Sequence, residues 1–204
     1  MGQEIVCQAK IGDQTTTGKL YLESSALLFR GGTRLKIPFA ELGDVRSKGG
    51  WVTLTHNGGN IAFQLGAKAE TWADKIRNPP TRLQKMDIEP GMVCGLIGPD
   101  PDALLAELNA SGVSVETPSG DGRIDSVIFV AESKSDLDAL KAAEKHITQP
   151  GSIWVVFRKG IQEITESDVM VAAKAAELVI PKTCSFSETR TALQCVIPVS
   201  RRSW

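Results

Sequence analysis

The stretch Gln149-Pro150-Gly151-Ser152-Ile153-Trp154-Val155-Val156-Phe157-Arg158-Lys159-Gly160 decides the fold. A Pro-Gly turn leads into five apolar residues, and two cations and a glycine follow them. A short apolar run that is bounded by turn residues and rich in β-branched and aromatic side chains is typical of a strand buried on both faces. Such strands lie in the middle of α/β sheets, whose ligands bind beyond the carboxyl ends of the strands. We therefore expect Arg158 and Lys159 at the edge of the sheet where a ligand can bind.

Residues 80–204 alternate between strand and helix patterns around this stretch. Apolar runs predict strands at 92–97, 113–116, 126–131 and 153–157, and helical periodicity predicts helices between them, one of them over 133–147. Asp100 is expected as a helix N-cap with Pro101 as the first helical residue, and Thr165 to Asp168 read as a capping box. A closing hairpin joins strands at 183–187 and 192–199. This order predicts a three-layer α/β domain with a mostly parallel sheet and a terminal antiparallel hairpin.

Residues 1–79 have a different pattern. Turn residues recur at close spacing between about seven short runs of alternating polarity, which predicts an antiparallel barrel or sandwich. The link Asn57-Gly58-Gly59-Asn60 is typical of a tight hairpin. The pattern then turns helical over residues 66–78, with Trp72 facing inward, and Pro79-Pro80 ends that helix. The sequence thus predicts two domains, residues 1–79 and 80–204.

Seven strands followed by one helix with an inward tryptophan resemble a pleckstrin-homology-like domain of the bacterial or GRAM type, over residues 3–78. The resemblance implies a lipid site at basic residues flanking the first hairpin, where this chain has Lys10 and Lys19. Tyr21 occupies the position where an arginine is expected, and Asp13 adds a negative charge. We therefore do not expect this domain to bind membrane lipid.

The second domain resembles class I methyltransferases. The line from Leu140 through Pro150-Gly151 to Val156 is similar to a late strand of that fold, and residues 125–129 are similar to the strand before it. The whole span 83–201 is similar to an uncharacterised bacterial family, known only as a domain of unknown function. That likeness rests on the segment Leu83 to Met92, on Trp154 with Lys159, and on the pair Glu188-Thr189. It implies a degenerate methyltransferase-like (Rossmann-like) core.

The loop that would hold the methyltransferase cofactor departs from the pattern of that fold. A glycine-rich turn lets the backbone approach a ligand, but here only Gly98 matches. Pro99 and Pro101 lack backbone N–H donors, and Asp100 would repel an anionic ligand. We therefore expect no use of S-adenosylmethionine and no other cofactor.

The ligand-binding candidates lie at the predicted strand ends, and no catalytic residue is identified. The candidates are Gly98, Asp100, Glu132, Arg158 and Lys159. Arg158 and Lys159 are either an anion subsite or solvated cations paired with Glu132 or Glu163. The choice stays open, because exposed cations are common and weakly interacting.

The bulk composition limits the partners. The chain has 23 Lys and Arg against 24 Asp and Glu, so the total charge predicts no nucleic-acid partner. Four separated cysteines and two histidines give no zinc pattern, and no metal site is expected. No signal segment or long apolar run is present, which predicts a cytoplasmic protein with free thiols. If the closing hairpin turns at Thr189-Arg190, Cys184 and Cys195 face each other on the core side.

These observations favour a non-catalytic protein-interaction or regulatory binding protein with a protein partner. The alternative is an enzyme or sensor that binds a small anionic or nucleotide-like ligand at the carboxyl ends of the parallel strands.

Overall fold

The computed structural model describes residues 3–120 and 122–202. These residues divide into two compact units at the Pro80–Thr81 peptide bond. No helix in the described ranges is long and apolar enough to cross a membrane.

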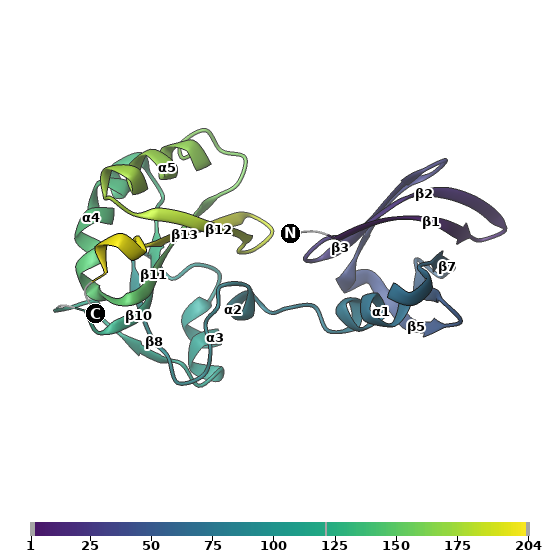
Figure 1. The fold of residues 1–204 in the computed structure, drawn as a ribbon, viewed down its shortest axis with the longest axis horizontal. Helices are drawn as coiled ribbons and strands as arrows, with labels where there is room; N and C mark the ends of the chain where they lie inside the picture. Colours follow the sequence, from purple (N-terminus) through teal and green to yellow (C-terminus); the bar gives the residue numbers. More distant parts are fainter. Residues whose placement is uncertain (1–2, 121, 203–204) are drawn as a thin grey trace. The chain divides into compact units, whose positions relative to one another are not determined.

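The N-terminal unit is a seven-stranded antiparallel sheet with the order β4-β3-β2-β1-β7-β6-β5 (Figure 1). Its strands are β1 (Gln3–Ile11), β2 (Gln14–Leu22), β3 (Ala26–Gly31), β4 (Arg34–Pro38), β5 (Leu42–Lys48), β6 (Trp51–His56) and β7 (Gly59–Gln64). The short turns η1 (Phe39–Glu41) and η2 (Gly66–Lys68) and the helix α1 (Ala69–Arg77) complete it. The sheet curls into a half-barrel. It is not the closed barrel that the sequence predicted, because β4 and β5 do not pair within the described residues.

One face of the curled sheet and one side of α1 enclose the core of this unit. Phe29 of β3 and Phe63 of β7 pack with ring centroids 5.7 Å apart. From α1, Trp72, Ala73 and Ile76 are buried against them. The period change that predicted the helix therefore also identified its buried face.

The C-terminal unit is a six-stranded mixed sheet with the order β12-β13-β11-β10-β8-β9. Its strands are β8 (Val93–Ile97), β9 (Ser114–Glu116), β10 (Ile124–Val130), β11 (Ile147–Arg158), β12 (Val179–Ser185) and β13 (Arg190–Val196). Strands β9, β8, β10 and β11 run parallel, and β13 and β12 add the antiparallel hairpin. The helical segments are α2 (Arg82–Lys85), α3 (Leu104–Ala110), η3 (Lys134–Ala139), α4 (Leu140–Ala143), η4 (Glu144–His146), α5 (Glu166–Ala175) and η5 (Val199–Arg201).

Strand β11 is buried on both faces, as its apolar run predicted. Ile153, Val155 and Phe157 pack in the cluster beneath α4 and α5. Trp154 and Val156 pack on the opposite face, in the cluster that includes the α3 residues Leu104 and Leu108. The sheet thus lies between two layers of helical segments, and one of the two clusters fills each space between sheet and helices.

The Pro150-Gly151 turn proves to be a bulge inside β11. Between two paired positions β10 advances from Ile124 to Ser126, whereas β11 advances from Ile147 to Ser152. A Cβ atom on Gly151 would lie 3.0 Å from the Asp125 carbonyl oxygen, so this position favours glycine. The bulge sets the register of the strand end that carries Arg158.

Two predicted helices differ from the structure. The helix after β8 begins at Leu104 and not at Pro101, because Asp102 and Ala103 both adopt left-handed backbone conformations before it. Residues 133–147 form a broken series of short helical turns, η3, α4 and η4, where one continuous helix was expected.

The predicted pairing of Cys184 with Cys195 is wrong. The register places Cys184 opposite Ala192, so the two strands are offset by three residues from the expected pairing. An odd offset moves a side chain to the other face of the sheet, and the cysteines lie in different core clusters. Both are free thiols, and burial raises the pKa of the Cys195 thiol to about 12.

Candidate functional site

The order of the strands in the C-terminal sheet reverses between β8 and β10. The chain leaves β8 through α3 to β9 on one side, whereas β10 and β11 lie on the other side. In open α/β sheets ligands bind outside the carboxyl ends of the strands at such a switch point. The predicted site residues lie at or just after the ends of β8, β10 and β11 in the sequence.

Gly98 and Asp100 shape the loop after β8. A Cβ atom on Gly98, which has a φ of +97°, would lie 2.7 Å from the carbonyl oxygen of Val130 in β10. The two backbones are therefore packed tightly at the switch point. The Asp100 carboxylate accepts a hydrogen bond from the backbone N–H of Leu105 at 3.1 Å. Both residues fix the backbone of the loop.

Glu132 and Arg158 come together at the ends of β10 and β11. Glu132 Oε2 lies 3.3 Å from Arg158 Nε, and its Oε1 accepts a hydrogen bond at 2.7 Å from Arg190 Nη2. Arg158 and Arg190 are register partners on β11 and β13. One carboxylate thus holds two guanidinium groups.

Arg190 is the member of this cluster that the sequence did not reveal. Its side chain is 10% exposed, and its Nη1 atom is buried without a hydrogen-bond partner in the described residues. Buried charged groups usually have all their donors satisfied. In the sequence Arg190 lies in a polar turn, and its burial depends on Glu132, 58 residues earlier.

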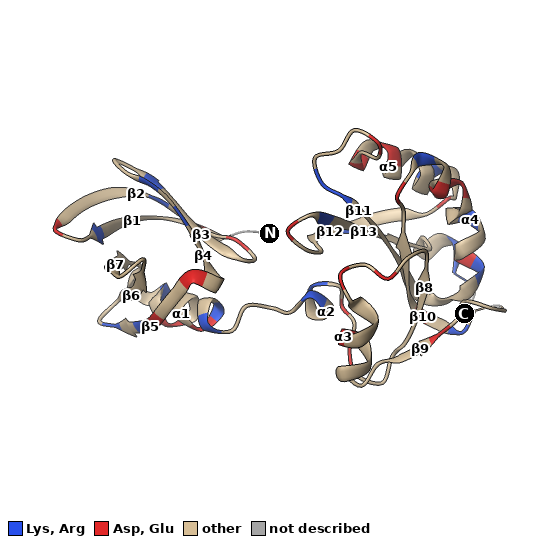
Figure 2. Ribbon diagram, turned by 180° about the vertical axis from the view of Figure 1, so that it is seen from behind, with Lys and Arg blue, Asp and Glu red and all other residues tan. Residues whose placement is uncertain are grey.

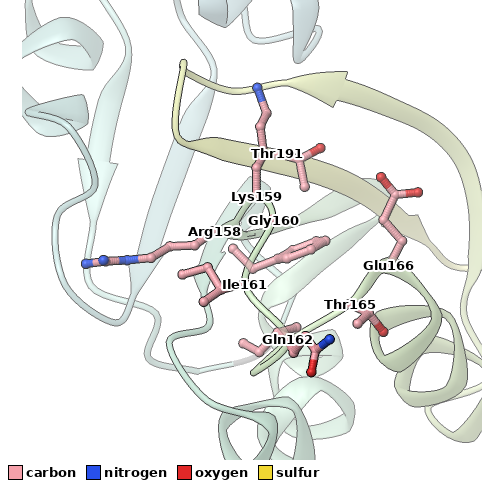
Figure 3. Close-up of a pocket in the computed structure, with 10 residues that line it drawn as sticks. Arg158, Lys159, Gly160, Ile161, Gln162, Thr165, Glu166 and Thr191 are labelled. Carbon is pink, nitrogen blue, oxygen red and sulfur yellow. The ribbon is translucent and has the colours of Figure 1, made fainter.

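Lys159 is oriented toward the β12–β13 hairpin. Its Nζ donates hydrogen bonds to Ser185 Oγ at 2.7 Å and to the Ser187 carbonyl oxygen at 2.6 Å. Burial, together with the positive charge of Lys85, lowers the pKa of Lys159. Figure 3 shows the Arg158 and Lys159 side chains pointing in different directions from adjacent positions.

A pocket of about 470 Å³ lies at the carboxyl end of β11, between that strand, the following loop and the start of α5. The lining combines apolar side chains with hydroxyl, amide and charged groups (Figure 3). It comprises Phe157, Arg158, Lys159, Gly160, Ile161, Gln162, Ile164, Thr165, Glu166 and Thr191. This volume and mixture are typical of small-molecule sites.

The start of α5 is held by its capping box, as predicted. Thr165 Oγ1 accepts from the Asp168 backbone N–H, and the Asp168 carboxylate accepts from the Thr165 N–H and hydroxyl. The Thr165 hydroxyl and the neighbouring Lys134 lower the pKa of Asp168 to about 2. The helix therefore gives the pocket a rigid wall.

The histidines lie elsewhere. His56 Nε2 is 3.0 Å from Glu41 Oε2, and His146 Nδ1 is 2.8 Å from the Gly120 carbonyl oxygen. Across residues 3–120 and 122–202, no three His, Cys, Asp or Glu side chains group as metal ligands.

No family model matches the chain, and no curated protein matches it. Solved structures similar to it include a SAM-dependent methyltransferase from Aquifex aeolicus (12% identity, 60% of this chain, 92% of that chain, TM-score 0.45). Another is a TehB-like SAM-dependent methyltransferase from Corynebacterium glutamicum (10% identity, 63% and 95%, TM-score 0.38). A third is the T. thermophilus 16S rRNA N2 G1207 methyltransferase (14% identity, 78% and 45%, TM-score 0.36).

These matches contradict the expectation of a non-catalytic interaction or regulatory protein, because the similar structures carry the names of enzymes. The Rossmann-like description of the C-terminal unit agrees with its strand order and its parallel core.

Proposed function

We propose that the C-terminal unit is the ligand-binding core of an enzyme, and that a small anionic or nucleotide-like molecule binds in the pocket at the end of β11. The pocket itself carries the proposal. It lies at the carboxyl end of the parallel strand β11, on the β13 side of that strand and not at the switch point between β8 and β10, and its volume of about 470 Å³ suits a molecule of nucleotide size.

The lining offers two kinds of contact to such a ligand. Ile161, which is 39% exposed, supplies apolar surface for a flat ring, and the buried Phe157 and Ile164 lie behind it. The amide of Gln162 supplies hydrogen bonds at its edge, whereas the Thr165 and Thr191 hydroxyls already donate to the Asp168 carboxylate and the Cys184 carbonyl oxygen and can only accept. A nucleoside combines both requirements in one molecule.

Arg158 is proposed to hold the anionic group. Its side chain is 58% exposed, and its contact with Glu132 uses Nε, which leaves both Nη atoms available to a ligand. Two donors on a planar guanidinium suit a phosphate or carboxylate. Glu132 is proposed to orient this arginine, and Gly98 and Asp100 to shape the adjoining loop.

We also propose that the N-terminal unit is pleckstrin-homology-like. Its seven antiparallel strands, followed by a helix with Trp72 buried against them, support this assignment.

Thermal unfolding with a ligand panel tests the proposed pocket. AMP, ATP, NAD and S-adenosylmethionine are each added at millimolar concentration to the full chain. A ligand at 100 times its Kd stabilises by about 2.7 kcal/mol, which raises Tm by roughly 5–10 °C in a chain of this size. We expect at least one nucleotide to produce such a shift.

Two tryptophan variants locate the site. Ile161→Trp fills the pocket and is expected to abolish the shift, whereas Val171→Trp on the exposed side of α5 is expected to keep it. Arg158→Ala is expected to weaken the binding of AMP more than that of adenosine, which lacks the phosphate. A panel without any shift would refute the proposal. A shift with S-adenosylmethionine that persists in Ile161→Trp would refute the location and favour the β8 loop.

A further inference from the structure

The strands of the N-terminal sheet concentrate positive charge. Residues 1–80 contain 10 Lys and Arg and 7 Asp and Glu, a net charge of +3. The seven strands hold seven of these cations but only two of the acids, Glu4 and Asp44, a net charge of 7 − 2 = +5. Figure 2 colours the Lys and Arg positions of these strands blue. All seven cations alternate with core residues and therefore lie on the outer face of the sheet, here called the basic face: Lys10, Lys19, Arg30, Arg34, Lys36, Arg46 and Lys48.

Three of these cations form a row across neighbouring strands. Lys19 is the register partner of Arg30, and Arg30 is the register partner of Arg34. Strands lie about 4.8 Å apart, so the row spans roughly 10 Å of backbone. Like charges directly opposite each other on a sheet are destabilising.

Little within the unit neutralises this row. Lys19 pairs with Glu4 at 2.9 Å. Arg30, Arg34 and Lys36 form no ion pair with another described residue, and all three are exposed. A bound anionic partner would neutralise these cations.

A groove of about 520 Å³ runs beside the row on β3 and β4. Its lining is Leu28, Phe29, Arg30, Arg34, Leu35 and Lys36. Leu28 and Leu35 are partly exposed, whereas Phe29 is buried in the core, so the groove offers a narrow apolar strip bordered by cations. Such a strip suits a ligand with flat rings and regularly spaced negative charges.

Aromatic side chains are interleaved with the cations. Arg30 lies over the Tyr21 ring at 5.1 Å from its centroid, and Lys10 lies over the Trp51 ring at 4.9 Å. Surfaces that bind single-stranded nucleic acid combine cations that follow the backbone with aromatic rings that stack on bases. A duplex groove admits a helix or a two-stranded ribbon, and a seven-stranded convex face is too broad for it.

We propose that the basic face binds single-stranded nucleic acid. This inference is independent of the pocket in the C-terminal unit. The sequence predicted no nucleic-acid partner because the charges of the whole chain nearly cancel. That sum does not show that the cations gather on one face of the N-terminal sheet. The contrasting explanation is that Arg34 and Lys36 only protect the free edge of β4 from pairing with other strands.

Fluorescence anisotropy with the full chain separates these explanations. Labelled 20-nucleotide oligo-U RNA and oligo-dT DNA are titrated at 50 and 200 mM salt. Single strands give a slope of about −0.7 in log K against log salt for each phosphate contact. Four contacts predict a roughly 50-fold loss of affinity between the two salt concentrations. Stronger binding of RNA than of DNA would indicate contacts to the 2′-hydroxyl. Binding of either oligonucleotide supports the proposal.

Matched double variants test the face itself. Arg30→Ala with Arg34→Ala removes two contacts and is expected to reduce the salt slope by about 1.4. Lys68→Ala with Lys75→Ala removes the same charge from two exposed positions outside the basic face, Lys68 at the end of η2 and Lys75 in α1. This double variant is expected to leave the salt slope unchanged. Because Arg30 and Arg34 oppose each other, their removal should not lower Tm, which separates loss of binding from loss of folding.

Three results would overturn the proposal. The first is no binding of either oligonucleotide at 50 mM salt, and the second is equal weakening by the two double variants. The third is tighter binding to poly-glutamate or to phosphatidylserine vesicles than to the oligonucleotides, which would assign the basic face to another partner.

Discussion

The two units use the same charged side chains in opposite ways. In the N-terminal unit the cations Arg30, Arg34 and Lys36 lie along strands, on an exposed face and without an ion-pair partner in the described residues. In the C-terminal unit Arg158 and Arg190 lie at strand ends and share one carboxylate. The first arrangement leaves charge available to an extended partner, and the second concentrates it beside one pocket.

The difference follows from the two kinds of sheet. In an antiparallel sheet with one solvated face, every second residue of a strand is exposed to solvent. Cations can therefore occupy many positions on that face. A parallel sheet covered on both faces leaves only the strand ends open. Cations therefore form a broad surface in one unit and a small site in the other.

Trp72→Ala has the largest expected effect and tests whether the two units unfold separately. Replacing a fully buried tryptophan by alanine costs about 3–5 kcal/mol, and Trp72 is 2% exposed in the core of the N-terminal unit. We expect denaturant unfolding, followed by circular dichroism, to show an early transition of the N-terminal unit. The transition of the C-terminal unit should keep its midpoint. A single shifted transition for the whole chain would show that the units unfold together.

Removal of Glu132 tests the paired charges with an intermediate effect. Glu132→Ala leaves Arg158 and the buried Arg190 uncompensated. Loss of one partner of a fully buried pair costs about 3–5 kcal/mol, but the Glu132 side chain is 37% exposed, so we expect about 1–3 kcal/mol.

Glu4→Ala is the matched change in the other unit. Both members of the Glu4–Lys19 pair are exposed, so solvent screens their interaction and we expect a much smaller loss of stability than for Glu132→Ala. Chemical denaturation measures the free energy of unfolding of both variants. Equal losses in Glu132→Ala and Glu4→Ala would show that the paired cluster and the exposed face do not differ in this respect.

The sequence predicted individual strands and helix starts more reliably than the register in which strands pair. The apolar run at 153–157 and the capping box at Thr165 identified β11 and the start of α5, because both depend on neighbouring residues. The register of the β12–β13 hairpin depends on its turn and on an irregularity between Val179 and Lys182. No local pattern encodes that offset, so the prediction for Cys184 and Cys195 was wrong.

The candidate site was accessible to sequence reasoning only in part. Strand ends are visible in the pattern, which is why Glu132 and Arg158 could be named. The burial of Arg190 depends on a carboxylate 58 residues away. The basic face depends on the alternation of seven strands and cancels when charges are summed along the chain.

The smallest expected effect concerns pH and the wall of the pocket. The pKa of Asp168 is lowered from 3.8 to about 2 by the Thr165 hydroxyl and Lys134. A carboxyl group whose pKa is lower in the folded state stabilises the fold above its unfolded pKa, and this contribution disappears as pH falls from 3.8 toward 2. Asp168→Asn should therefore lower the Tm of the C-terminal unit at pH 6 and have a smaller effect at pH 2. Glu166→Gln changes a carboxylate in the same turn that takes no part in the capping box, so it is the control and should lack this pH dependence. An equal loss of Tm at both pH values in Asp168→Asn would show that the carboxylate charge does not hold the first turn of α5.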